Sequence, residues 1–160
     1  MTTVAIQYSV TSAITCTMST LAASSARGST PVYNTTTLYD DAMLHIEVQT
    51  NTSTPTDVVK ACLVYLYSSL DGVTWTGSKL ENVSTDIGIT LESPTNLKFA
   101  GAINMPGTNS AYRADFPIAP ILGYMPAAWG FVIQNRVGFP LNTTAANLIA
   151  SYAGIKYTIA

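Results

Sequence analysis

The sequence predicts an all-β fold: a single-domain antiparallel β-sandwich that is jelly-roll-like and has an extended N-terminal segment. Apolar residues alternate with polar ones in several short runs, which is the period of a strand with one buried face. Gly, Pro, Asn and Asp separate these runs, and no stretch keeps a helical apolar period over about ten residues. Roughly seven to nine short strands with such turns are typical of a sandwich or jelly roll. The length of 160 residues fits one domain.

The N-terminal zone, residues 1–37, is rich in Thr, Ser and Ala and shows no helical period. Near its start, Val4, Ile6 and Tyr8 fall on one face of an extended chain. We therefore expect an extended segment or arm with short strands, followed by a β-sandwich core at 38–160. Two arrangements stay open, because the segment either folds back in short strands or lies on a neighbouring subunit.

Two central runs carry the strongest strand patterns. Residues 38–50 alternate between an apolar face and a mostly polar one, which indicates a half-buried strand. Residues 58–69 are apolar on both faces toward their middle, which favours a central strand. Asp71-Gly72 then predicts a tight hairpin turn, because both residues tolerate a positive φ. The returning strand of this hairpin is predicted at 73–76.

The second half of the chain continues with short apolar runs between turn residues, and these runs predict further strands. The segment 119–125 contains a proline and lacks alternation, so we expect a loop or a single helical turn there. The further strands are predicted at 86–91, 96–104, 111–118, 128–134 and 150–159.

Charged residues are unusually scarce. They make up 10% of the chain, against about 25% in typical globular domains. Because charged groups are costly to desolvate, the cores of protein interfaces are depleted in them, and this composition favours a permanent assembly. A Thr- and Ser-rich secreted domain is the alternative. The net charge of −2 and scattered basic residues predict no nucleic-acid partner. No apolar stretch approaches about 18 residues, so no membrane partner is expected.

The sequence contains few groups that could run chemistry. Its one histidine, His45, excludes a histidine-based zinc cluster, and no Gly-X-Ser-X-Gly or Gly-rich phosphate motif occurs. Asp40-Asp41 suit a turn at a strand edge, with a calcium site as the alternative. Cys62 lies in an apolar run and is expected to be a buried thiol, while a disulfide with Cys16 stays open. We expect no enzyme activity, no cofactor and no metal site.

Two stretches, 64–75 and 121–138, together resemble small β-sandwich virion structural proteins of tailed bacteriophages. The first contains Ser-Leu-Asp-Gly-Val-Thr-Trp, and the second contains Pro-Ala-Ala-Trp-Gly-Phe-Val-Ile-Gln-Asn. Between them lie 96–101 and then Tyr112-Arg113. The resemblance spans about residues 38–160 and implies a structural role in the phage particle, without catalytic residues.

The resemblance implies a capsid decoration or cement protein that stabilises the head by binding between major capsid subunits on the capsid exterior. A tail, baseplate or tail-fibre component is the second hypothesis, and a carbohydrate-binding module is the third. The expected partners are the major capsid protein or other virion proteins, together with further copies of this chain in a dimer or trimer. The candidate interface residues are Val4, Ile6, Tyr8, Arg27, His45 and Trp129.

Overall fold

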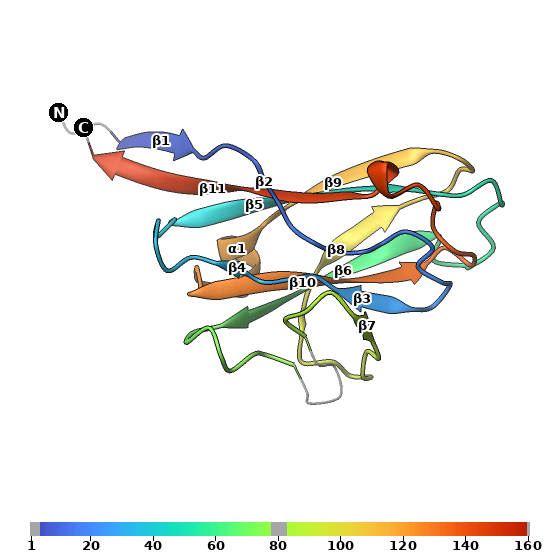
Figure 1. Ribbon diagram of the computed structural model, residues 1–160, viewed down its shortest axis with the longest axis horizontal. Helices are drawn as coiled ribbons and strands as arrows, with labels where there is room; N and C mark the ends of the chain where they lie inside the picture. The colour runs from blue at the N-terminus through green and yellow to red at the C-terminus, as the bar shows by residue number, and fades with distance from the viewer. Residues whose placement is uncertain (1–3, 78–82, 160) are drawn as a thin grey trace.

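The computed structural model describes residues 4–77 and 83–159 and is built almost entirely of strands (Figure 1). A short helix and a short 3-10 turn are the helical elements of this described part of the chain. The elements are β1 (Val4–Tyr8), β2 (Ser12–Ala13), β3 (Ala26–Gly28), β4 (Val32–Tyr33), β5 (Asp41–Gln49), β6 (Ala61–Ser69), β7 (Gly88–Ile89), β8 (Lys98–Asn104), β9 (Ala111–Pro117), α1 (Ile118–Leu122), β10 (Ala128–Arg136), η1 (Ala145–Asn147) and β11 (Ile149–Ile159).

The strands form two antiparallel sheets, which confirms the predicted all-β sandwich. The first sheet has the order β1-β11-β5-β9, and β2 also pairs with β11. The second sheet has the order β7-β3-β10-β6-β8, and β4 also pairs with β10. Strands that are neighbours in a sheet are mostly far apart in the chain.

The pairing follows the topology of a jelly roll. The first half of the chain pairs with the second half in reverse order, so that β1 joins β11, β3 joins β10, β5 joins β9 and β6 joins β8. This long double ribbon is rolled up so that its paired strands are shared between two sheets, as in jelly rolls. Two further contacts, β11 with β5 and β10 with β6, complete the sheets.

The main core lies between the two sheets. On β5 the inward side chains from Ala42 to Val48 are fully buried at alternate positions, as the period of two predicts. Trp129 and Phe131 on β10 meet them from the second sheet, and both are fully buried. The ring of Trp129 packs edge-on against the ring of Tyr152 on β11, with 5.7 Å between centroids. Side chains from both sheets therefore interdigitate in one continuous core.

A second, smaller core covers the outer face of the second sheet. The connection between β6 and β8 runs back across this face and forms β7 beside β3. Tyr67 of β6 and Val132 of β10 are buried against Ile89 and Leu97 of this connection. This cover explains why β6 is apolar on both faces, and the predicted central position of β6 is confirmed by its place between β10 and β8.

The hairpin predicted at Asp71-Gly72 is wrong. Gly72 has the expected φ of 74° and the chain does turn here, but 73–76 forms no strand. The carboxylate of Asp71 accepts the backbone N–H groups of Val73 and Thr74, which curls the loop instead of extending it. The true strand neighbours of β6 are β10 and β8. The strand predicted at 86–91 likewise shortens to β7.

The N-terminal zone forms short strands as predicted, but most of it is part of the sandwich rather than a separate arm. Strands β2, β3 and β4 pair with β11 and β10. Ile14, Met18 and Leu21 are buried in the main core. These contacts pack the segment 12–33 against its own chain. The predicted strands at 96–104, 111–118, 128–134 and 150–159 are confirmed as β8 to β11.

Candidate functional site

Three connections meet at one end of the sandwich, which we name the loop end: 34–40, 70–76 and 118–127. Tyr33 and Ser69 both pair with Ala128, so the first two connections leave the sheet beside the start of β10. The third connection begins next to β5, because the N–H of Ala119 donates to the carboxylate of Asp41 at 2.7 Å. The jelly-roll pairing thus places chain segments that are distant in sequence on one surface.

The loop end carries exposed apolar side chains. Leu70 is 75% exposed and Val73 is 78% exposed. Two hollows, of about 370 and 380 Å³, open between the connections. The exposed apolar residues are Tyr33, Leu38, Leu70, Val73 and Tyr124. The first hollow is lined by Ser68, Ser69, Leu70, Asp71, Thr74, Trp75, Thr76 and Tyr124, and the second by Asn34, Thr35, Leu38, Met125, Pro126 and Ala127.

The aromatic side chains of the loop end pack against each other and against residues of β4 and β6. Trp75 packs edge-on against both Tyr33 and Tyr67, with centroids 6.5 and 5.4 Å apart. The hydroxyl oxygens of Tyr124 and Ser68 lie 3.1 Å apart, within hydrogen-bond distance. These contacts hold the rings in place, and Tyr33 and Tyr124 remain partly exposed.

At the loop end, the carboxylate of Asp71 accepts hydrogen bonds from residues of its own loop. Its carboxylate accepts hydrogen bonds from the N–H groups of Val73 and Thr74 and from the hydroxyls of Ser69 and Thr74, all at 2.7 to 2.9 Å. The N–H of Thr74, followed by the other donors, lowers the pKa of Asp71 well below its ordinary value. The carboxylate therefore orders the loop and has few lone pairs left for a ligand.

A second surface is the ribbon of β1 and the end of β11. Figure 1 shows this ribbon extending past the start of β5, where Asp41 is the last β5 residue to pair with β11. The predicted interface residues Val4, Ile6 and Tyr8 lie on it and are 61%, 56% and 68% exposed. Their partners in the register include Tyr157 and Ile159, which are also exposed, so these side chains share one apolar face.

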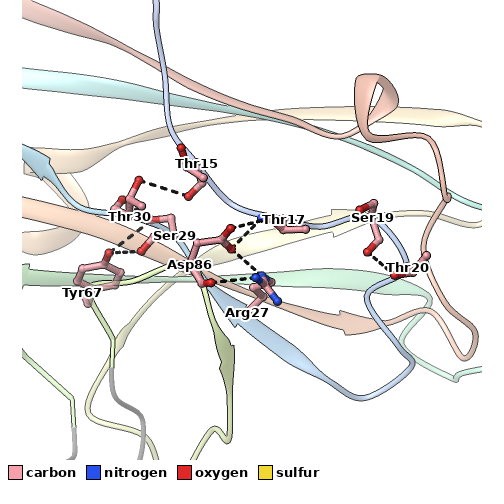
Figure 2. A network of polar contacts seen from close by, with 9 residues as sticks. All are labelled: Thr15, Thr17, Ser19, Thr20, Arg27, Ser29, Thr30, Tyr67 and Asp86. Carbon is pink, nitrogen blue, oxygen red and sulfur yellow. Dashed lines mark hydrogen bonds and ion pairs between the residues drawn. The ribbon is translucent and has the colours of Figure 1, made fainter.

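Arg27 is engaged within the chain (Figure 2). Its Nε donates to a carboxylate oxygen of Asp86 at 2.6 Å, and Asp86 also accepts the N–H and the hydroxyl of Thr17. Burial raises the pKa of Asp86, but the hydrogen bonds from Arg27 and Thr17 outweigh it and lower that pKa. The network joins the N-terminal zone to the connection between β6 and β8, so the guanidinium of Arg27 is engaged by its own chain.

Replacing Asp86 with alanine is expected to lower the free energy of unfolding by about 1–3 kcal/mol at neutral pH, because Arg27 loses its carboxylate while only 27% of its side chain is exposed. A carboxylate whose folded pKa is lowered stabilises the fold above its unfolded pKa, near 4, and this contribution is lost as the pH falls through the folded pKa. The difference between variant and wild type in urea unfolding should therefore shrink in acid.

The matched control for Asp86 is Asp115, whose carboxylate pairs with the ring nitrogen of His45 but whose side chain is 62% exposed. Asp115→Ala should change the free energy of unfolding by no more than about 0.5 kcal/mol. Equal losses in the two variants would show that the network in Figure 2 adds no more to stability than the exposed pair does.

His45 lies on the outer face of the first sheet, where polar side chains pair across neighbouring strands. Its Nδ1 is 2.7 Å from a carboxylate oxygen of Asp115 on β9. Two residues along, Arg113 makes two hydrogen bonds to the carboxylate of Glu47. These bonds lower the pKa of Glu47 and raise that of Arg113. This face is consequently polar and internally paired, in contrast to the apolar ribbon beside it.

Trp129 does not belong to any surface, so its prediction as an interface residue is wrong. Its side chain is 0% exposed. It occupies the same face of β10 as Phe131 and Ile133, and that face points between the sheets. The sequence places Trp129 at the start of a strand, but it does not show that both faces of this strand are covered by other parts of the chain.

The chemical alternatives raised by the sequence have structural explanations. The two aspartates at the start of β5 accept backbone N–H groups, Asp41 from Ala119 and Asp40 from Tyr157. Cys16 and Cys62 are free thiols, and burial raises the pKa of both, that of Cys62 to about 12. Within residues 4–77 and 83–159, no cluster of three His, Cys, Asp or Glu residues could hold a metal ion.

The loop end is the surface that sequence reasoning missed. The available signal was Leu70, which directly precedes the predicted Asp71-Gly72 turn, where polar residues are more usual. Leu38 and Val73 gave no such signal, because both were placed at the start of predicted strands. In the described part of the chain, no helix has the length and apolar character needed to cross a membrane.

No protein family, curated protein or solved structure matches this chain.

Proposed function

We propose that this chain is a non-enzymatic structural protein of a tailed-phage virion that decorates the capsid and binds between major capsid subunits through its loop end. The observation that carries this proposal is the loop end itself, where exposed apolar side chains surround two preformed hollows. Apolar patches of this kind on a charge-poor protein mark contacts with other proteins.

The two stretches that resemble phage virion proteins both reach the loop end, which supports the proposal that it is the contact surface. Residues 64–75 contain most of β6, and residues 121–138 contain all of β10. These two strands pair with each other along nine residues. Both stretches also extend into the loop end, through 70–75 and 121–127. The resemblance thus concerns one contiguous part of the fold together with its exposed loops.

The distribution of charge supports a protein partner. All three arginines are paired with acids within the chain: Arg27 with Asp86, Arg113 with Glu47 and Arg136 with Asp57. A phosphate backbone is bound by clustered, available cations. A decoration protein, in contrast, occurs in many symmetric copies, so modest apolar contacts are sufficient for stable attachment.

The copy number in purified virions tests the proposal. Quantitative mass spectrometry of virions of the phage that encodes this chain should find it in copy numbers comparable to the major capsid protein. A few copies to some dozens per particle would favour the tail or baseplate instead. Absence from the particle would overturn the virion assignment.

The loop end is tested by co-sedimentation of the purified chain with capsids stripped of it. The double variant Leu70→Glu and Val73→Glu should bind at least about tenfold more weakly, because the interface would have to desolvate two new charges. The matched control is Val58→Glu, at a position that is 94% exposed outside the loop end. Unchanged binding of the double variant would remove the loop end from the contact.

A further inference from the structure

Strand β1 is an unprotected edge. It forms one border of the first sheet, and no other strand of the described residues covers its free side. Edge strands are commonly protected by charged residues, prolines, bulges or short length. The opposite border, β9, contains Arg113, Asp115 and Pro117, whereas β1 contains no charge, no proline and no bulge.

The other sheet shows the same protection at both borders. Strand β8 contains Lys98 and is paired with β6 through a bulge between Val64 and Tyr65. Strand β7 has only two residues. Among the borders of the two described sheets, β1 is therefore the one suited to accept another strand.

The backbone of β1 points its free groups outward at three positions. In an antiparallel ladder, hydrogen-bonded pairs alternate with non-hydrogen-bonded pairs. The N–H of Ser9 donates to the carbonyl of Gly154 at 2.8 Å, so the next pair, Tyr8 with Ile155, is non-hydrogen-bonded. Counting back by two, Ile6 and Val4 occupy the same type of position. The N–H and C=O groups of these three residues consequently face the open edge.

The far side of the ladder agrees with this assignment. Tyr157 is opposite Ile6, and its N–H points away from β1 and donates to the carboxylate of Asp40 at 2.7 Å. Both residues of the pair thus direct their backbone groups away from each other, as a non-hydrogen-bonded pair requires.

We propose that β1 pairs antiparallel with β1 of a second copy of this chain, about a two-fold axis at Ile6. In this register Ile6 is opposite its own symmetry mate, and Val4 is opposite Tyr8 of the second copy. All three outward positions then exchange backbone hydrogen bonds, and one sheet continues through β9-β5-β11-β1 of both copies. Such a contact is isologous, the commonest form of homodimer.

The side chains favour a second copy as the occupant. Because the register pairs even-numbered positions with even-numbered ones, Val4, Ile6 and Tyr8 of both copies lie on one face. Within the described ribbon, 4–8 with 155–159, that face also contains Tyr157 and Ile159 and no charged residue, so two identical surfaces meet without repulsion.

The two-stranded ribbon of β1 and the end of β11 would be stabilised by a third strand. Beyond Ile155, β11 no longer pairs with β5, and its last residues pair with β1 alone. A two-stranded ribbon is at best marginally stable in water, and a third strand with an apolar face stabilises it. The second copy supplies that strand, and the dimer would form whether or not a particle is present.

The test is the mass of the purified chain in solution, measured by light scattering after size-exclusion chromatography over a range of concentrations. The wild type should have twice the 17.0 kDa mass of one chain. Ile6→Lys and Ile6→Glu should each weaken dimerisation at least about tenfold, because two like charges would face each other across the axis. An equimolar mixture of the two variants should recover the dimer.

The matched control is Gln7→Glu, since Gln7 is also exposed but faces the opposite side of the ribbon, beside Lys156. It should dimerise like the wild type. A wild type that stays monomeric, a trimeric mass, or variants that dimerise unaided would each overturn the proposal. So would a mixture that fails to recover the dimer while near-ultraviolet circular dichroism shows both variants folded. None of these results would affect capsid binding through the loop end.

Discussion

Replacing Trp129 with alanine is expected to lower the free energy of unfolding by about 3–5 kcal/mol, the range for large aromatic residues truncated in a core. The side chain is fully buried between the sheets and packs edge-on against Tyr152. The cavity left behind would be bordered by strands of both sheets, which cannot collapse into it without breaking their register. Urea unfolding followed by circular dichroism measures the loss.

The same experiment separates a core role from a surface role. Tyr8→Ala removes an aromatic ring that is 68% exposed, and it should change the free energy of unfolding of the monomer by no more than about 0.5 kcal/mol. Trp129→Phe should fall between the two, because it keeps part of the packed volume. A Trp129→Ala variant as stable as Tyr8→Ala would return Trp129 to the surface, where the sequence first suggested it.

Replacing Gly130 with alanine is expected to cost about 1–3 kcal/mol or more, although it adds a single methyl group. A Cβ atom there would lie 2.3 Å from the Cζ and Oη atoms of Tyr67, its direct partner on β6. The ring cannot easily move aside, because its hydroxyl donates to the carbonyl of Ser29 at 2.6 Å in the network of Figure 2. Ser29 in turn accepts the N–H of Phe131 on its hydroxyl, which anchors this point to β10.

The chain offers a matched control for this substitution. Gly88 also lies in a strand, but a Cβ there would meet nothing within 4 Å, so Gly88→Ala should change stability by no more than about 0.5 kcal/mol. If the clash with Tyr67 causes the loss at Gly130, Gly130→Ala should be nearly neutral in a Tyr67→Ala background. An equal loss in both backgrounds would assign the cost to the glycine backbone instead.

The sequence predicted the position of most strands, because alternation records which side chains face the core. Residues 42–48 are the clearest case, since every second side chain is fully buried in β5. The run at 58–69 also indicated a strand covered on both faces. The segments that provide the second cover, within 70–77 and 83–97, carry no signal of that role, because they are mostly irregular and act through long-range contacts.

Some candidate site residues could likewise be placed from the sequence alone, whereas others depended on contacts with distant parts of the chain. The sequence put Val4, Ile6 and Tyr8 on one face, and the structure leaves that face exposed. For Arg27 and Trp129 the residue type suggested an interface, but each has partners inside the chain that are far away in sequence. The loop end could not be predicted, because its three connections are neighbours only after the sheets have formed.

By itself, then, the sequence determined an all-β chain with few charges, the approximate bounds of its longer strands and the face on which their side chains lie. Only the tertiary structure decided which strands pair, that Asp71-Gly72 ends in a curled loop, and that β1 is the unprotected edge. The physical reason is that a period of two specifies a face but not a partner. Partners are selected by the packing of the whole core, which joins residues from opposite ends of the chain.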